Sequence, residues 1–266
     1  MIFFLGGLKI LTVRLDNSRS HRILWMLDLL ELDYDVKVYL RHPETWRGPK
    51  SLFKVHPLGK APILEIHFDD GSDPLQLVES GLMMQYILEH YDFYGLLTTK
   101  DESENLMINY YLHYAEGSLE HILMALLINS TAKTIAPFGM KSIAKLVANG
   151  LNQGYYIHEY RLNMDYLEAQ LVENGTGYFV GDKLTAADII LSFPIYENLF
   201  DNEDGVKECT NDKRDIYKLW PNLGAWCIRV VRNNPSYQRI TEMMYQMIEN
   251  YKIQSEQAKK LKRKSK

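Results

Sequence analysis

The first ninety residues alternate short apolar runs with one helical stretch that is apolar on nearly every side. Runs at residues 9–15, 36–40, 63–67 and 75–78 have the length and composition of β-strands. Residues 20–31, between the first two runs, predict the helix, which must be covered on more than one face. We expect the sheet to cover one face and a second domain to cover the other.

Turn-forming and capping residues complete this first domain. The sequence Asp-Asp-Gly-Ser-Asp at residues 69–73 predicts a hairpin between the third and fourth strands. Ser80 is typical of an N-cap and starts a second helix that reaches about Tyr91. Residues 41–55 are polar and hold at most a short irregular helix. The order strand, helix, strand, hairpin, helix predicts an α/β, thioredoxin-like domain over residues 8–92.

The rest of the chain has helical spacing and no convincing strand, which predicts an all-α C-terminal domain over residues 101–251 after a linker at 92–100. This spacing predicts helices at residues 106–129, 155–173, 219–232 and 236–251. Residues 133–150 predict either an extension of the first of these helices or an additional helix.

Three local features mark this second half. Thr185 and Asp188 fit a capping box, which predicts a helix start at this point. Residues 206–218 are charged and rich in turn formers, and they predict a surface insertion. The basic run within residues 252–266 predicts a disordered tail, with docking on anionic lipid as the less common alternative.

Composition narrows the function classes. A net charge of -4 argues against a nucleic-acid partner. Cys209 and Cys227 do not form a C-x-x-C motif, which makes a disulfide framework or a cysteine-based zinc site improbable. We therefore expect no metal and a reducing, cytoplasmic compartment. The apolar residues 1–8 are too short for a bilayer span of about 20 residues, and with the basic tail they leave association with a membrane surface open.

Two short segments point to a site for a small acidic peptide. Ala61-Pro62 stands at the start of the third strand, where a proline cannot donate to the ladder, and it indicates a turn with a cis bond as one option. Such a turn leaves the backbone of Ala61 available to an extended ligand. The helix that starts at Ser80 offers free N–H groups and a dipole to a carboxylate. Taken singly, a plain turn and a plain cap are the commoner explanations of these two features.

Taken together, the motifs resemble those of the glutathione S-transferases over about residues 8–245. The marks are residues 18–25, 56–62, 79–81 and 181–188, and the likeness is greatest to fungal transferases of the yeast Gtt-one type, whose fourth helix carries an Asn-Tyr-Tyr-Leu stretch, here at 109–112. The resemblance implies a homodimeric detoxification enzyme that conjugates glutathione to hydrophobic electrophiles. Glutathione-dependent reduction of hydroperoxides is a further activity of this kind, and a non-catalytic binding or regulatory module of the same fold is the alternative.

The resemblance also implies three anchors for glutathione. The backbone of Ala61 would pair with the cysteinyl unit, where Pro62 turns the chain. Glu79 would take the ammonium group of the γ-glutamyl end and Ser80 its carboxylate. Lys60 would meet the glycine carboxylate.

The chemistry requires a group that stabilises the thiolate. A thiol of pKa near 8.5 is only a few per cent ionised at neutral pH, and attack on an electrophile needs the thiolate. Lowering that pKa by about two units takes about 2.7 kcal/mol, which a hydroxyl donor and the N-terminus of the helix near Ser20 can supply. In serine-type members this hydroxyl lies four residues before a basic residue, as Ser18 precedes Arg22. Ser20 and Asn17 are alternatives, and so is a plain N-cap role for Ser18.

The electrophile pocket is expected on the helix predicted at residues 106–129. Tyr110, Tyr114 and His121 recur on one face of that helix. By resemblance they would line the pocket, and the alternative is that they form interdomain core. His56 stands where many relatives have Asn, and we expect it to be structural.

Overall fold

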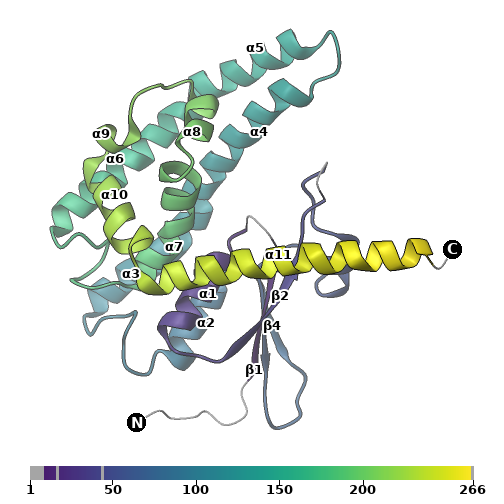
Figure 1. Ribbon diagram of the computed structural model, residues 1–266. Coiled ribbons are helices and arrows are strands. Elements are labelled where there is room, and N and C mark those ends of the chain that lie inside the picture. Colours follow the sequence, from purple (N-terminus) through teal and green to yellow (C-terminus); the bar gives the residue numbers. More distant parts are fainter. Residues whose placement is uncertain (1–8, 16–17, 43–44, 265–266) are drawn as a thin grey trace. The chain divides into compact units, whose positions relative to one another are not determined.

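The computed structural model describes residues 9–15, 18–42 and 45–264, with the backbone alone described for residues 9, 14, 15, 133 and 254–264. These residues form two compact units (Figure 1). Unit 1 comprises the described residues up to Tyr91 together with the C-terminal helix from Pro235, and unit 2 comprises Asp92–Asn234. The boundaries expected from sequence, 8–92 and 101–251, differ from these because the last helix belongs to unit 1.

Unit 1 contains a four-stranded sheet. Its strands are β1 (Lys9–Leu15), β2 (Tyr34–Tyr39), β3 (Ile63–His67) and β4 (Leu75–Leu77), in the order β2-β1-β3-β4. β1 runs parallel to β2 and antiparallel to β3, and β3 runs antiparallel to β4. This is the thioredoxin-like arrangement that the sequence predicted, and β1 and β3 have the expected bounds.

Helices cover both faces of this sheet. α1 (Ser20–Leu29) contacts β1 and also α2 (Ser80–Tyr91), and every residue from Ser20 to Leu27 is buried. On the opposite face, Val13 and Ile63 pack with Leu52, which belongs to the short helix η1 (Lys50–Lys54). Because side chains alternate along a strand, a single run of residues such as β1 supplies both of these layers.

The last helix, α11 (Pro235–Lys264), gives α1 a second cover within unit 1 (Figure 1). Leu24 of α1 packs with Ile240 and Met244 of α11, and Asp28 accepts hydrogen bonds from Ser236 and from Arg239. The sequence placed this helix in the C-terminal domain because its spacing shows an apolar face but not the partner of that face.

α11 also extends past the end that was expected for it. Periodicity placed the end of the helix at Tyr251 and a disordered tail at residues 252–266, whereas the helix continues to Lys264. Residues 252–264 are mostly Lys, Gln, Glu and Ala, which are good helix formers, and they contain no Gly or Pro.

Unit 2 is built from helices. They are α3 (Glu102–Tyr114), η2 (Ala115–Glu120), α4 (His121–Ile135), α5 (Lys141–Leu151), η3 (Asn152–Tyr156), α6 (Ile157–Asn174), α7 (Ala186–Leu191), η4 (Ser192–Phe200), α8 (Glu203–Thr210), α9 (Ile216–Leu219), α10 (Pro221–Trp226) and η5 (Cys227–Arg232). The long helix expected at residues 106–129 therefore runs from α3 through η2 into α4.

The segment expected as a surface insertion, residues 206–218, differs from its prediction. Most of it belongs to α8 and α9, and Thr210 and Ile216 are buried. Most of its charged residues are exposed, which is why its composition resembled that of a loop.

The capping box at α7 is confirmed. Thr185 and Asp188 satisfy each other's backbone donors, and the fully buried Asp188 carboxylate also accepts hydrogen bonds from the Phe179 N–H and from Trp226 Nε1. Burial nevertheless raises the pKa of Asp188 to about 6. Among the described residues, no helix combines the length and the apolar character needed to cross a bilayer.

Candidate active site

The predicted anchors lie at one end of the sheet in unit 1. Val13 of β1 pairs with Ile63 of β3, and Leu64 of β3 pairs with Leu77 of β4. The loop after β1, the turn before β3 and the turn after β4 therefore meet at the same end. The sheet register alone brings together three segments that are far apart in the sequence.

The turn before β3 has the cis Ala61–Pro62 bond that the sequence offered as an option. Pro62 is buried and Ala61 is half-buried, and the ladder with β1 begins only at Ile63. Ala61 packs against the same apolar cluster as Val78, the residue before Glu79. This shared cluster holds the two predicted glutathione-binding segments beside each other.

Lys60 is exposed and follows a tight turn. His56 accepts hydrogen bonds from two backbone groups of this turn, from the Leu58 N–H at its Nδ1 (3.3 Å) and from the Gly59 N–H at its carbonyl (2.9 Å). Gly59 has a φ of 56°, and a Cβ there would lie 2.6 Å from the ring of Phe53. These contacts support the expected structural role of His56.

Glu79 and Ser80 form the turn into α2. Glu79 is exposed and has a φ of 70°, a conformation that is uncommon for a residue other than glycine and that concentrates at functional sites. Ser80 is the first residue of the helix and is buried, and its Oγ accepts a hydrogen bond from Nη2 of Arg22 (3.2 Å). The left-handed backbone of Glu79 gave no signal in the sequence.

The contact that Arg22 makes in this region was not predicted from the sequence. Arg22 is completely buried in α1 and ties that helix to the start of α2 through Ser80. Its spacing from Ser18 was visible in the sequence, but its partner, 58 residues away, was not. The guanidinium carries its charge to the place where a carboxylate of the ligand is expected.

Ser18 and Ser20 lie within hydrogen-bond distance of each other. Their Oγ atoms are 2.8 Å apart, Ser20 is completely buried and Ser18 is 7% exposed. The residue at the N-cap position of α1 is Arg19, and Ser18 Oγ lies 3.5 Å from the Ser20 N–H, which is long for a capping bond. The plain N-cap alternative for Ser18 thus has weak geometry. Asn17 lies outside the described residues.

The residues predicted for the electrophile pocket all lie in unit 2. Tyr110 stacks on Tyr114 with ring centroids 5.5 Å apart, and Tyr114 Oη donates to Asn163 Oδ1. Burial raises the pKa of both phenols, so they stay neutral near pH 7. His121 is exposed at the start of α4. Unit 1 thus assembles the seven predicted catalytic and glutathione-binding residues, and unit 2 carries the other three.

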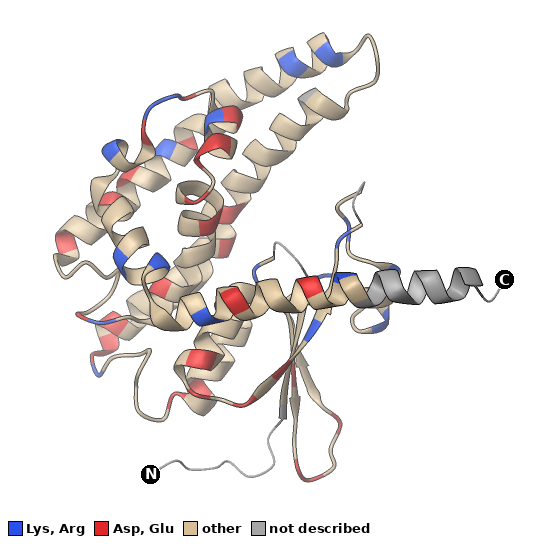
Figure 2. Ribbon diagram, in the orientation of Figure 1, with Lys and Arg blue, Asp and Glu red and all other residues tan. Residues whose placement is uncertain are grey.

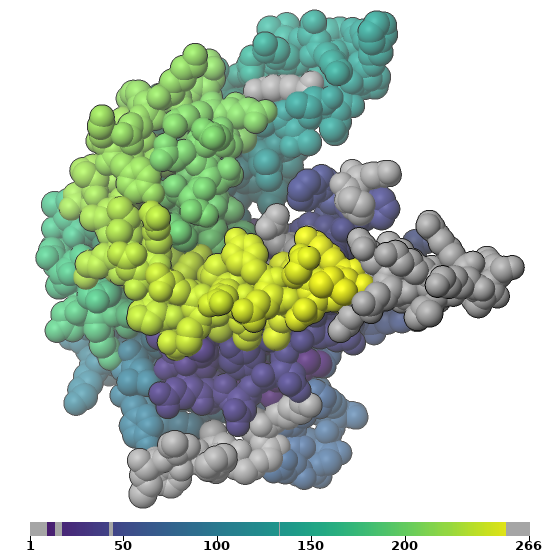
Figure 3. Space-filling model, viewed as in Figure 1, coloured from purple at the N-terminus to yellow at the C-terminus, as the bar shows by residue number. Residues whose placement is uncertain are grey.

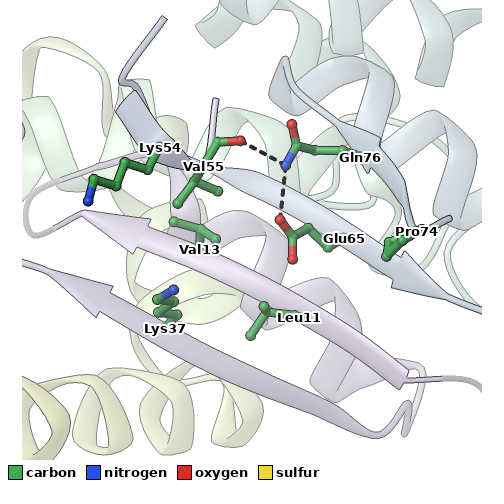
Figure 4. A pocket seen from close by; sticks show the side chains of 8 residues that line it. All are labelled: Leu11, Val13, Lys37, Lys54, Val55, Glu65, Pro74 and Gln76. Atoms are coloured by element: carbon green, nitrogen blue, oxygen red, sulfur yellow. Dashed lines mark hydrogen bonds between the residues drawn. The ribbon is translucent and has the colours of Figure 1, made fainter. Parts of the chain in front are cut away.

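A separate cavity of about 430 Å³ opens on the sheet of unit 1 (Figure 4). Gln76 crosses it and donates hydrogen bonds to the Val55 carbonyl (3.1 Å) and to Glu65 Oε1 (2.9 Å). Its lining contains none of the residues predicted for the glutathione site. Within the described part of the chain, no three His, Cys, Asp or Glu side chains gather closely enough to hold a metal ion.

Comparison with known proteins identifies the family. Residues 18–90 match the glutathione S-transferase N-terminal domain and residues 135–236 match the glutathione S-transferase C-terminal domain. Glutathione S-transferase 1 of Saccharomyces cerevisiae is 40% identical over 68% of this chain and 77% of its own length. Glutathione S-transferase 3 of Schizosaccharomyces pombe is 33% identical over 84% of this chain and 82% of its own length. The chain belongs to the glutathione S-transferase family.

Solved structures agree with this assignment. A glutathione S-transferase from Actinobacillus pleuropneumoniae is 27% identical with a TM-score of 0.62, covering 88% of this chain and 92% of that one. A glutathione transferase homologue from Lodderomyces elongisporus, solved with two glutathione molecules per subunit, shares the fold at 22% identity and a TM-score of 0.65, covering 90% of this chain and 99% of that one. The fold class expected from sequence, an α/β N-terminal domain followed by an all-α domain, is therefore that of the family.

Proposed function

We propose that the chain transfers the thiolate of glutathione to hydrophobic electrophiles, with Ser18 as the residue that donates a hydrogen bond to the sulfur. Membership of the family makes the protein a glutathione transferase rather than a non-catalytic module. The observation that supports Ser18 is the pair of Oγ atoms 2.8 Å apart at the start of α1.

The pair suggests a division of labour between the two serines. When Ser20 donates its hydroxyl proton to Ser18 Oγ, the proton of Ser18 remains available for the sulfur. A hydroxyl that accepts one hydrogen bond becomes a better donor in the next. Ser20 is completely buried and acts as a positioning residue, whereas Ser18 retains some exposure.

The reaction then needs few parts. The thiol releases its proton to solvent, the thiolate lone pair forms a C–S bond with the electrophile, and the leaving group departs with the electrons of the bond that breaks. Ser18 and the N–H groups at the start of α1 lower the free energy of the thiolate relative to the thiol. The chain's contribution is thus to hold the tripeptide in place and to stabilise its anion.

The anchors divide the charges of glutathione among them. Ala61 would present its backbone to the cysteinyl unit, and Lys60 its ammonium group to the glycine carboxylate. Glu79 would bind the γ-glutamyl ammonium group, and Ser80 the neighbouring carboxylate. Arg22 holds the Ser80 hydroxyl at 3.2 Å and places a positive charge behind it, which favours an anion at that point.

Single substitutions of the two serines test the thiolate assignment. We expect Ser18→Ala to lower kcat/KM with a chromogenic electrophile about 100-fold, the effect of removing one donor to a developing or stabilised anion. Ser20→Ala should lower it less, about tenfold, because a neutral hydrogen bond contributes about 1 kcal/mol. Ser72→Ala, in the exposed hairpin, is the control. Full activity in both variants would show that neither hydroxyl serves the sulfur.

The backbone of Glu79 allows binding to be tested apart from folding. Asn tolerates the left-handed region better than Glu, so Glu79→Asn should leave the free energy of unfolding unchanged or raise it slightly. The same change removes the carboxylate that would bind the γ-glutamyl ammonium group, and calorimetric titration should show glutathione affinity falling about tenfold. Unchanged affinity would remove Glu79 from the site.

The remaining parts of the proposal concern the second substrate and the assembly. We place the electrophile beside Tyr110, Tyr114 and His121, and we expect a homodimer that works in the cytoplasm. Tyr110→Ala should change the ranking of a panel of electrophiles while the affinity for glutathione stays constant. Equal losses with all electrophiles would assign Tyr110 to the core of unit 2.

A further inference from the structure

One face of α1 is packed against α11 inside unit 1. Its members recur at the spacing i, i+3, i+4 and i+7, which is that of a single helix face, and they are His21, Leu24, Trp25 and Asp28. The residues of α11 that contact the first three of them have the same spacing, and they are Tyr237, Ile240, Thr241 and Met244. Figure 3 shows the yellow atoms of α11 lying against the purple N-terminal part of unit 1. Two regular helix faces therefore make this contact, and His21 is the member nearest to the serine pair.

His21 is held by α11 in two ways. The centroid of its ring lies 4.2 Å from that of Tyr237, and its Nε2 lies 3.2 Å from Oγ1 of Thr241. Thr241 Oγ1 also donates a hydrogen bond to the carbonyl of Tyr237 (2.8 Å). Because a hydroxyl group carries a single proton, both bonds form together only when the Nε2–H of His21 is the donor to Thr241. This assigns a proton to Nε2 and joins two residues that are 220 positions apart.

A polar ring is unusual on this buried face. His21 is 4% exposed, and its neighbours Leu24 and Trp25 are completely buried. The charged residues of α11 whose side chains are described are all exposed, as the red and blue bands along the helix show (Figure 2), and they are Arg239, Glu242, Glu249 and Lys252. A phenyl ring would fill the same space without the cost of removing polar nitrogens from water. The histidine adds a directional bond, which fixes the orientation of its helix turn and not only its distance from α11.

The first turn of α1 depends on contacts of this kind. Arg19, which occupies the N-cap position, contributes no side-chain capping bond, and the turn contains no acidic residue to interact with the helix dipole. Free N–H groups at a helix start are available to an anion, as the proposed role in stabilising the thiolate requires. Side chains that bond to neighbouring helices hold this turn instead. Arg22 bonds to Ser80 at the start of α2, and His21 bonds to α11.

We propose that His21 is a positioning residue of the transferase site. Its bond to Thr241 and its ring contact with Tyr237 fix the first turn of α1. Ser20 directly precedes His21, and its Oγ lies 2.8 Å from that of Ser18, so a rotation of this turn moves both hydroxyl groups relative to the sulfur. A displacement of about 1 Å at a reacting group can lower a rate about 100-fold. The inference rests on the proposed role of Ser18 as the donor to the thiolate.

Thr241→Val tests the bond with little disturbance, because valine has nearly the shape of threonine and cannot accept a hydrogen bond from His21. We expect the pKa of the bound glutathione thiol, followed by ultraviolet absorbance, to rise by about one unit and kcat to fall by about tenfold, the factor that one pKa unit represents. KM for glutathione should not change, since the predicted anchors of the tripeptide lie outside α1.

Substitutions of His21 itself give a second, independent measurement. His21→Phe keeps a ring against Tyr237 but loses the donor, and it should raise the thiol pKa as Thr241→Val does. The double variant should resemble each single variant, because both remove the same bond. His21→Gln, whose amide nitrogen can take the place of Nε2 as a donor, should retain most of the lowered thiol pKa. Effects that add in the double variant would contradict the assigned bond.

Ser236→Ala is the matched control. It removes a hydrogen bond between the same two helices, the one that Ser236 donates to Asp28, at the other end of the contact. Asp28 lies about 12 Å along α1 from Ser20. The control should lower the free energy of unfolding about as much as Thr241→Val does, and it should leave both the thiol pKa and kcat unchanged. Equal rises of the thiol pKa in Ser236→Ala and Thr241→Val would show that the contact is only structural, which would overturn the proposal.

Ser18→Ala in the same assay separates this inference from the proposed function. A thiol pKa that rises in Ser18→Ala but not in Thr241→Val or His21→Phe would overturn the inference and leave the role of Ser18 intact. A thiol pKa that rises in Thr241→Val but not in Ser18→Ala would show that His21 positions a different donor, so that the role of Ser18 is the part that fails. A thiol pKa that changes in none of these variants would overturn both.

Discussion

In two regions of this protein the burial of side chains differs from the usual pattern, in which apolar side chains are inside and polar ones outside. The end of the sheet in unit 1 buries the polar side chains of Ser18, Ser20, Arg22 and Ser80, whereas the hairpin formed by α4 and α5 exposes large apolar ones. Departures of this kind are expected where a ligand or another surface completes the structure.

Asp188 shows that a buried polar group is not by itself a sign of function. Its carboxylate receives hydrogen bonds from Thr185, Phe179 and Trp226, all within unit 2. The comparison therefore teaches a narrower rule. Buried polar side chains indicate a ligand site where they lie at the end of the sheet, beside exposed residues such as Lys60 and Glu79 that could bind a ligand. They indicate a structural role where other groups of the chain satisfy all their hydrogen bonds.

The largest effect should come from removing this architectural group. Asp188→Ala leaves three residues with buried donors that lose their acceptor, and we expect the free energy of unfolding to fall by about 3–5 kcal/mol. Urea denaturation measures the change, and Asp182→Ala, at an exposed position, should stay within about 0.5 kcal/mol of the wild type. A loss below 1 kcal/mol for Asp188→Ala would contradict the role assigned to the capping box.

The same carboxylate predicts a pH dependence of stability. Its pKa in the folded state is about 6, above the ordinary value near 3.9, so the folded state binds the proton more tightly than the unfolded state. The resulting stabilisation is fully present below about pH 4 and is lost as the pH rises through 6, a change of about 3 kcal/mol. Measured relative to Asp188→Asn, the unfolding free energy of the wild type should fall between pH 4 and pH 7. A difference that is constant or that rises with pH would contradict a raised pKa.

Arg22 tests whether the buried polar end of unit 1 serves the ligand. Arg22→Met keeps most of the packing but removes the charge and the hydrogen bond to Ser80. The hydrogen bond from Arg22 to Ser80 lies within the folded protein, so its loss should lower the free energy of unfolding by about 1.5–3 kcal/mol. We expect glutathione affinity to fall at least tenfold as well, because the positive charge behind the expected ligand carboxylate is lost.

Titration calorimetry and urea denaturation of the same samples check this expectation. Arg47→Met, at an exposed position, should change neither quantity. A large loss of stability in Arg22→Met with unchanged glutathione affinity would mean that Arg22, like Asp188, has a structural role only.

The smallest effect is expected at the hairpin. Leu146 is 75% exposed, so Leu146→Ser should change the free energy of unfolding by less than about 0.5 kcal/mol. Leu167→Ser on α6 makes the same chemical change at a fully buried position and should cost several kcal/mol. Equal losses at the two positions would mean that the Leu146 side chain is covered within the protein.

The sequence predicted the thioredoxin-like unit well because its signals are local. The alternation in residues 9–15 and 63–67 and the turn at Ala61-Pro62 each act over a few residues. The capping box at Thr185 in unit 2 is local in the same way. The partner of α11 could not be predicted, because helical spacing reveals an apolar face but not what covers it. The bond from Arg22 to Ser80 and the left-handed backbone of Glu79 depend on the packing of α1 beside α2, which no single segment encodes.

The hairpin illustrates a different limit. Ile143, Leu146 and Val147 recur with the same helical spacing as buried residues elsewhere in unit 2. Periodicity alone would therefore favour buried positions for them. Only the structure shows that Ala148 is covered in their place. The absence of acidic residues from positions 121–158 is a second feature of the sequence that sets this segment apart from the rest of unit 2.

The most direct test of the enzyme assignment is the pKa of glutathione's thiol when it is bound to the protein. Ultraviolet absorbance of the thiolate, followed against pH, measures it in the wild type and in Ser18→Ala. We predict a pKa about two units below the value near 8.5 of a free thiol, and a return most of the way to that value in Ser18→Ala. A bound thiol that titrates near 8.5 in the wild type, or a lowered pKa that survives the loss of Ser18, would contradict the account.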